Sequence, residues 1–115
     1  MRKVREIQFY KTYFLGFYAS QDETTQEKID YVFDIIRYEK HVPRKFFKLL
    51  TNTEGIYEVR IRAVNGSIRV LSFFDDGNLV VLTNGFYKKT RKTPAREIRR
   101  AKKIKQEYFI EKHSM

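Results

Sequence analysis

The sequence predicts an α+β protein with a small, mostly antiparallel sheet and a C-terminal helix. Three segments read as consecutive strands of a meander: 56–63, 67–74 and 78–83. Asn65-Gly66 and Asp75-Asp76-Gly77 separate them, and both are turn sequences typical of hairpins. A Thr-Pro pair then precedes a long, basic helical segment. A chain of 115 residues is long enough for one core, so we expect a single domain over residues 1–115.

The first half of the chain reads as one strand followed by two helices. Residues 4–13 alternate as a strand does. Thr24 and Glu27 form a capping-box pattern ahead of a helix over 25–38, and Pro43 opens a shorter helix over 44–50. The apolar side of the first helix is predicted to consist of Ile29, Val32, Phe33 and Ile36. We expect the helices to cover one face of the sheet and to leave the other partly open.

The final helix is predicted to begin at Thr93 and to end near Phe109. Thr93 suits the N-cap and Pro94 suits the first helical position. Its apolar side is predicted to consist of Ile98, Ala101, Ile104 and Tyr108. The basic residues of this helix largely point elsewhere, so we expect them to face solvent or a partner.

The charge of the chain is strongly positive and unevenly distributed. The formal net charge is +10, and ten Lys or Arg residues but only one carboxylate lie between Phe86 and Lys105. A basic segment at the rim of a small sheet is typical of proteins that bind phosphate-rich partners. Nucleic acid is therefore the leading partner predicted from composition alone.

Several kinds of chemistry are excluded by residue content. The chain has no cysteine, which rules out disulfides, thiolate catalysis and Cys-based zinc sites. His41 and His113 lie far apart and lack partners at metal-binding spacing, so we expect no metal, no cofactor and no histidine acid–base pair. The apolar run near the N-terminus is broken by Gln8 and Lys11, and we interpret it as mature structure. No segment is long enough to span a membrane, and a cytoplasmic location is expected.

Strand alternation assembles a cluster of basic side chains. Glu58, Arg60 and Arg62 share one face of their strand, and the hairpin brings Arg69 of the next strand beside them. Lys88 and Lys89 follow just beyond the last strand. Glu58 is placed where it could orient the arginines. The cluster is either an anion-binding site or a solvated face of ion pairs.

Such a cluster suits phosphoryl transfer. Guanidinium groups bind phosphate oxygens in pairs of hydrogen bonds and stabilise charge that develops in the transition state. A lysine crowded by other cations can have its pKa lowered enough to act as a general base. The candidate catalytic residues are Arg60, Arg69, Lys88 and Lys89. The candidate nucleic-acid-binding residues are Arg62, Tyr87, Arg91, Lys92, Arg96, Arg99, Arg100 and Lys103, with Tyr87 suited to stacking on a base.

The segment from about residue 54 to residue 108 resembles a known family. The sequences GIYEVRIR and NGFYKKTRKTPAREI, with the apolar strands between them, are similar to the RelE/ParE toxin superfamily. Within it the pattern looks most like the HigB-like branch common in bacteria and phages. The resemblance implies a RelE-like fold and the toxin of a type II toxin–antitoxin pair. Similar toxins enter the ribosomal A site and cleave mRNA without a metal, by attack of the 2′-hydroxyl on the adjacent phosphate.

The resemblance also implies roles for particular residues and partners. Arg69 matches the arginine that binds the scissile phosphate, and Arg60 matches a basic residue of the preceding strand. Lys88 and Lys89 lie where RelE has a Lys-Arg pair, one of which assists the leaving group. The implied partners are an antitoxin of helix-turn-helix type encoded by an adjacent gene, the ribosome with its mRNA, and operator DNA bound through the antitoxin complex.

Two departures from RelE leave alternatives open. Glu58 stands where RelE has a lysine, and the RelE tyrosine maps to Pro94 and Ala95. The general base could therefore be Arg60, Lys88 or Lys89. A gyrase poison of the ParE type is the second hypothesis for function, since that branch does not cut RNA. A non-catalytic nucleic-acid binder that uses the basic helix alone is the third.

Overall fold

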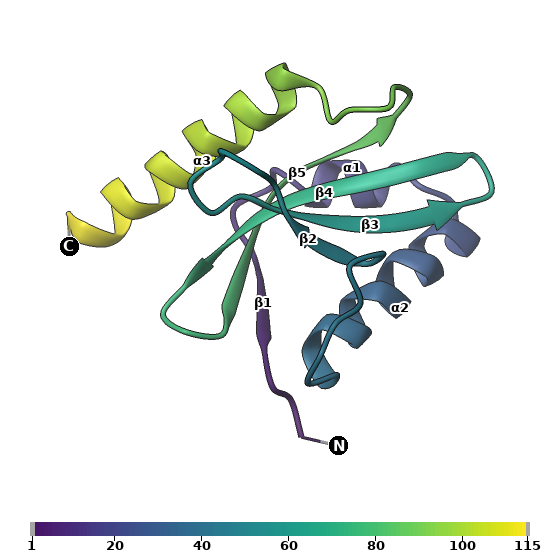
Figure 1. Ribbon diagram of the computed structural model, residues 1–115, viewed down its shortest axis with the longest axis horizontal. Coiled ribbons are helices and arrows are strands. Elements are labelled where there is room, and N and C mark those ends of the chain that lie inside the picture. Colours follow the sequence, from purple (N-terminus) through teal and green to yellow (C-terminus); the bar gives the residue numbers. More distant parts are fainter. Residues whose placement is uncertain (1, 115) are drawn as a thin grey trace.

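One mixed sheet and three helices make up the part of the chain that the structure describes. The structure is a computed structural model that describes residues 2–114. In chain order the elements are β1 (Glu6–Phe9), α1 (Leu15–Ala19), α2 (Glu23–Tyr38), β2 (Phe47–Leu49), β3 (Tyr57–Ala63), β4 (Gly66–Asp75), β5 (Leu79–Lys88) and α3 (Ala95–His113). The five strands form a single sheet in the order β1-β5-β4-β3-β2 (Figure 1). The predicted α+β class with a C-terminal helix is confirmed.

The predicted meander forms the centre of the sheet. β3, β4 and β5 pair antiparallel in sequence order, and Arg60 of β3 lies directly opposite Arg69 of β4. Ala63 pairs with Gly66, so the hairpin turn consists of Val64 and Asn65, one residue earlier than predicted. Gly66 has φ of +139°, a conformation that residues with a Cβ rarely adopt.

A bulge divides β5 into two halves. Ser72 pairs with Leu82 and Val70 pairs with Gly85, so Thr83 and Asn84 lie where β4 has only Leu71. One extra residue of this kind shifts the strand relative to its partner and increases the local twist. The half before the bulge pairs in parallel with β1, and the half after it extends β5 as far as Lys88. The bulge therefore sets which face of the sheet Lys88 lies on.

The larger core lies between α2 and one face of the sheet. Asp22 caps α2, since its carboxylate accepts a hydrogen bond from the Thr25 amide at 2.8 Å; the predicted cap at Thr24 is two residues too late. The side of α2 that faces the sheet is the one predicted, and all four of its residues are buried: Ile29, Val32, Phe33 and Ile36. They pack on alternate residues of the meander: Val59, Ile61, Ala63, Ile68, Val70, Val80 and Leu82.

The expectation that the helices cover one face of the sheet is wrong, because α3 packs on the face opposite α2 (Figure 1). Ala101, Ile104 and Tyr108 of α3 are buried. They contact the strand residues that point away from α2, chiefly Leu71 and Phe73. α3 covers only part of this face. The end that carries Arg60 and Arg69 stays accessible.

The first predicted strand is too long. β1 spans only Glu6–Phe9, because it pairs only with residues 79–82 of β5 before that strand bulges. Lys11, with φ of +51°, then turns the chain into α1, a short helix that the sequence did not predict. Phe14, just before α1, is almost fully buried among the aromatic side chains of the larger core. Its ring lies against the backbone of Gly85, where an added Cβ would come within 2.9 Å.

The predicted helix over 44–50 is also wrong. Residues 47–49 form the edge strand β2, which pairs antiparallel with residues 57–59 of β3. Phe47 stacks on Tyr57 with ring centroids 4.9 Å apart, and it meets Phe74 edge-on. In so short a segment, pairing with the sheet and packing of the aromatic rings stabilise the strand more than the helical spacing of its apolar residues stabilises a helix.

Both ends of α3 are fixed to the sheet by polar contacts. At its start the Asn84 amide donates to the Glu97 carboxylate at 2.9 Å and to the Glu97 carbonyl at 3.2 Å. Pro94 occupies the N-cap, so Thr93 does not cap the helix as predicted. The helix continues to His113, past the predicted end at Phe109. There Lys112 and Tyr108 both bind the buried carboxylate of Asp75, at 2.8 and 2.6 Å.

The pKa of Asp75 predicts how stability depends on pH. Burial raises this pKa, but hydrogen bonds from Lys112 and Tyr108 and the charge of Lys112 bring it below the ordinary value of 3.8. Burial and the hydrogen bond to Asp75 also raise the pKa of Tyr108 to about 12. The pKa of Asp75 is lower in the folded state than in the unfolded state. The stability that Asp75 contributes is therefore fully present above its unfolded-state pKa, and it is lost as the pH falls through its folded-state pKa.

We therefore expect wild type to lose more stability than Asp75→Asn as the pH falls below about 4. Urea unfolding of both proteins over roughly pH 2 to 7 measures this. The difference in midpoint should be largest near neutral pH and should shrink in acid. A difference that does not change with pH would contradict the role assigned to Asp75.

Candidate functional site: a cationic cluster around a buried carboxylate

Four basic side chains lie together on the part of the sheet that α3 leaves uncovered. We call Lys48, Arg60, Arg69 and Lys88 the cationic cluster; they come from β2, β3, β4 and β5 respectively. The strand register explains their meeting. Arg60 pairs with Arg69, Ser67 pairs with Lys88, and Lys48 pairs with Glu58. Paired residues of neighbouring strands point to the same side, so all four share one face with Glu58.

Glu58 lies at the centre of the cluster and has no exposed surface. One of its oxygens, Oε1, accepts a hydrogen bond from Arg60 Nε at 2.9 Å. Arg69 Nε lies 3.4 Å from the same oxygen, which is within ion-pair range but lacks hydrogen-bond geometry. The other oxygen, Oε2, accepts a hydrogen bond from the hydroxyl of Thr93. A buried carboxylate is costly unless it is paired, and these partners satisfy Glu58.

The arginine side chains are held while their ends stay accessible. Arg69 donates from one terminal nitrogen to the Ile68 carbonyl at 3.1 Å. The side chains of Arg60 and Arg69 are 27% and 15% exposed, so both reach the surface. A shallow pocket of about 410 Å³ lies over them, and its lining consists of Lys45, Phe46, Arg60, Ile61, Arg62, Ser67 and Arg69. This pocket is large enough for a phosphate group and is lined by cations.

The surroundings of the cluster shift two pKa values. Burial lowers the pKa of the Lys88 ammonium; the charge of Arg69 lowers it further, as do the charges of Arg60 and Lys48, and Glu58 opposes them. Burial also lowers the pKa of the Arg69 guanidinium. A lysine in such surroundings is more readily deprotonated than one in water. The pKa of Lys88 is therefore shifted in the direction that favours a lysine base.

The structure brings some of the candidate residues together and separates others. Arg60, Arg69 and Lys88 lie in the cluster, whereas Lys89 follows the end of β5 and is exposed. Tyr87 lies on the opposite face, where it packs on Phe17 and donates to Gln21 at 2.6 Å. Six other candidates are exposed around the site and along α3: Arg62, Arg91, Lys92, Arg96, Arg99 and Arg100.

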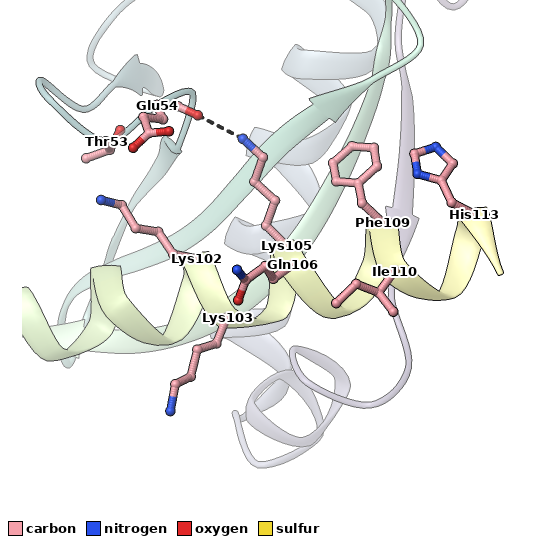
Figure 2. A pocket seen from close by; sticks show the side chains of 9 residues that line it. All are labelled: Thr53, Glu54, Lys102, Lys103, Lys105, Gln106, Phe109, Ile110 and His113. Carbon is pink, nitrogen blue, oxygen red and sulfur yellow. Dashed lines mark hydrogen bonds between the residues drawn. The ribbon is translucent and has the colours of Figure 1, made fainter.

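The last RNA-binding candidate, Lys103, lies away from the cluster at a groove along α3. Figure 2 shows this groove, of about 580 Å³, between α3 and the loop that joins β2 to β3. Lys105 reaches across it and donates to the Glu54 carbonyl at 2.8 Å. Phe109 and Ile110 supply an apolar end, and Ile110 is 67% exposed. The α3 groove shares no lining residue with the pocket over the cationic cluster.

Sequence reasoning missed two residues of the site. Lys48 lies in the segment predicted as a helix, although its apolar neighbours Phe47 and Leu49 alternate with it as in a strand. Thr93 was assigned to a helix cap, which is the common use of a threonine before proline. Nothing in the local sequence indicates that its hydroxyl reaches Glu58, because that contact joins segments 35 residues apart.

Within residues 2–114, no group of three or more His, Asp or Glu side chains is placed to hold a metal ion. Over the same residues, none of the helices is both long enough and apolar enough to cross a membrane.

Comparison with known proteins identifies the family. Residues 17–106 match the family described as Phage derived protein Gp49-like (DUF891), which covers most of the chain, including the cationic cluster. The chain therefore belongs to the Gp49-like family. This family is part of the RelE/HigB-like toxin superfamily, whose RelE-like members are endoribonucleases. Membership is consistent with the toxin of a toxin–antitoxin pair and implies an antitoxin partner. No individual curated protein matches the chain.

Proposed function

We propose that the chain is the toxin of a type II toxin–antitoxin pair, of the HigB-like branch and with a RelE-like topology, and that it cleaves mRNA on the ribosome. The observation that carries this proposal is the cationic cluster, in which Arg60 and Arg69 pair with buried Glu58 and line an open pocket, and Lys88 shares their face of the sheet. Residues 1–115 act as one toxin domain in the cytoplasm. The antitoxin is of the helix-turn-helix type, is encoded by an adjacent gene and joins the toxin on operator DNA.

The proposed reaction needs no metal. The 2′-oxygen of a ribose attacks the adjacent phosphorus while a base takes its proton. The bond from phosphorus to the 5′-oxygen of the next nucleotide breaks, and that oxygen leaves with a proton. The products are a 2′,3′-cyclic phosphate and a free 5′-hydroxyl. Arg69 and Arg60 bind the non-bridging phosphate oxygens, whose charge grows in the transition state.

Among the candidates for the general base we favour Lys88. Its surroundings lower its pKa, whereas arginine side chains in general are not deprotonated in proteins and make poor bases. Lys89 follows the end of β5 and is exposed, and we assign to it the transfer of a proton to the leaving oxygen. The exposed cations on either side of the site are proposed to bind the RNA backbone: Arg62, Arg91, Lys92, Arg96, Arg99, Arg100 and Lys103. Tyr87 would have to leave its contact with Gln21 to stack on a base.

Induced expression in bacteria tests the proposal. Wild type is compared with the double variant Lys88→Ala/Lys89→Ala, and cuts in a translated reporter mRNA are mapped by primer extension. Growth arrest with cuts inside translated codons is expected for wild type only. We expect the double variant to be about 10²-fold or more slower in cleavage, because it lacks the groups that transfer protons. A reporter with its start codon removed serves as the control for ribosome dependence.

Two other outcomes would overturn the proposal in different ways. Arrest with intact mRNA and an induced DNA-damage response would favour a gyrase poison of the ParE type. Normal growth with wild-type protein present at high level would favour a nucleic-acid binder without catalytic activity. In that last case affinity should fall gradually as each Lys or Arg of α3 is removed.

A further inference from the structure

We propose that Glu58 and Thr93 act together as positioning residues, which fix the two arginines of the cationic cluster in the orientation that binds the reacting phosphate. This inference rests on the proposed function for its reaction and on the geometry of the site for its residues. Neither residue is itself assigned contact with RNA. Their effect is exerted through Arg60 and Arg69.

In both arginines, Nε faces Glu58 and the two terminal nitrogens of the guanidinium are left for other contacts. Arg60 turns its Nε towards Glu58, and so does Arg69. A guanidinium has five N–H donors, of which Nε carries only one. The terminal nitrogens of Arg60 therefore keep all their donors for the pocket, and those of Arg69 give up one to Ile68. Free guanidinium ends of this kind bind phosphate oxygens through pairs of hydrogen bonds.

Without Glu58 this arrangement would not persist. Arg60 and Arg69 lie directly opposite each other on neighbouring strands, where like charges repel. The fully buried carboxylate between them is the anion that offsets this repulsion. It also fixes their direction, because long side chains otherwise sample many rotamers. Glu58 thus provides the negative charge that holds the two arginines together before a substrate phosphate is bound.

Thr93 fixes Glu58 in turn and connects it to the basic loop. Its hydroxyl donates to the carboxylate oxygen that the arginines leave free. Thr93 ends the exposed segment 89–92, which carries Lys89, Arg91 and Lys92. The contact therefore ties the loop that carries one catalytic candidate, Lys89, and two RNA-binding candidates, Arg91 and Lys92, to the cationic cluster. It also spans from β3 to the start of α3, so both sides of the site are joined through one carboxylate.

The isosteric variants Glu58→Gln and Thr93→Val test the pair, with Thr90→Val as the matched control. Thr90 lies in the same loop, but its hydroxyl bonds the Lys92 carbonyl and not Glu58. Binding is measured by titrating each protein with a short 2′-deoxy oligonucleotide, which cannot be cleaved, and following the Nε–H signals of Arg60 and Arg69 by NMR. Cleavage of the matching RNA in programmed ribosomes is followed under single-turnover conditions.

A positioning role predicts a specific set of results. Glu58→Gln removes one negative charge from the site, so charge alone would strengthen the binding of RNA. We nevertheless expect Glu58→Gln to cleave about 10²-fold more slowly than wild type, because a small misplacement of catalytic groups lowers the rate strongly. Thr93→Val should lose less but in the same direction, and Thr90→Val should match wild type. In Glu58→Gln the two Nε–H signals should lose their separate, fixed positions and respond less to the oligonucleotide.

The pH profile separates positioning from general support of the fold. Four charged groups act on Lys88 from the neighbouring strands. They are Arg69 of β4, Arg60 and Glu58 of β3, and Lys48 of β2. Glu58 is the group that opposes their effect, so its replacement should move the acidic limb of the rate profile to lower pH. Unfolding alone would reduce the amplitude at every pH and leave the limb in place.

The outcomes separate the two proposals. Wild-type protein that cuts no RNA would refute the proposed function, while the NMR titration would still report whether Glu58 and Thr93 order the arginines. Unchanged Nε–H signals and oligonucleotide affinity in both variants would overturn the positioning role. So would a Glu58→Gln variant that cleaves as fast as wild type.

Discussion

Replacing Arg69 by alanine is expected to slow mRNA cleavage by about 10² to 10³-fold, because it removes a donor to charge that develops in the transition state. Arg69 belongs to the cationic cluster, and its side chain is only 15% exposed, which limits the water that could replace it. Arg69→Lys should recover only part of the loss, since an ammonium keeps the charge but not the planar fork. Single-turnover cleavage of a short RNA in programmed ribosomes measures both variants.

Arg62→Ala is the matched control for Arg69→Ala. Arg62 shares the same face of β3 and lines the same pocket, but it is exposed and makes no contact with Glu58. We expect a weaker salt dependence of binding and less than about a tenfold loss of rate, as for a residue that contacts backbone phosphate alone. Circular dichroism should show that both variants are folded. Equal losses in Arg62→Ala and Arg69→Ala would mean that the pocket attracts RNA without a defined phosphate site.

Replacing Phe14 by alanine is expected to destabilise the fold by about 3–5 kcal/mol, the cost usual for removing a buried aromatic ring. Phe14 is 1% exposed and packs against Phe9, Phe17 and Phe33, with centroids 5.6 to 6.0 Å away. Its ring also fills the space beside Gly85, three residues before Lys88. A loss of this size is a large share of the roughly 5–15 kcal/mol by which small domains are stable. Urea unfolding measures it.

Tyr31→Ala provides the aromatic control for this stability measurement. Tyr31 lies on α2 but is 62% exposed, so its removal opens no cavity. We expect a change within about 0.5 kcal/mol, as is usual for surface positions. A loss below about 1.5 kcal/mol in Phe14→Ala would show that the neighbouring rings collapse into the space, because the cost of a cavity depends on how far its surroundings relax.

The cationic cluster was largely predictable because it depends on strand alternation and one hairpin. The alternation of residues 57–63 correctly places Glu58 and Arg60 on the face away from the α2 core. The hairpin then brings Arg69 opposite Arg60, even though the turn lies one residue from where it was predicted. Strand alternation alone does not place Lys88, since the bulge at Thr83 and Asn84 determines on which side of the sheet Lys88 lies.

What the sequence could not predict depends on contacts between distant segments. The apolar spacing of residues 44–50 suits a short helix as well as a strand, and only pairing with β3 decides between them. That decision places Lys48 beside Glu58 and so adds a cation to the site. In α3, periodicity identifies which residues are buried, but it does not say which face of the sheet they cover. Helices on opposite faces therefore went unpredicted.

The parallel pairing of β1 with β5 affects when the protein can fold during its own synthesis. Glu6 pairs with Leu79, so the first strand to leave the ribosome has no partner until most of the chain has followed. Residues that surround Glu58 come from β2, β3, β4, β5 and the segment before α3, and none of these pairs with β1 except β5. Because chains emerge from the N-terminus, the pocket over the cationic cluster is completed only near the end of translation. On the proposed function, a growing chain would lack a complete cleavage site while the ribosome is still making it.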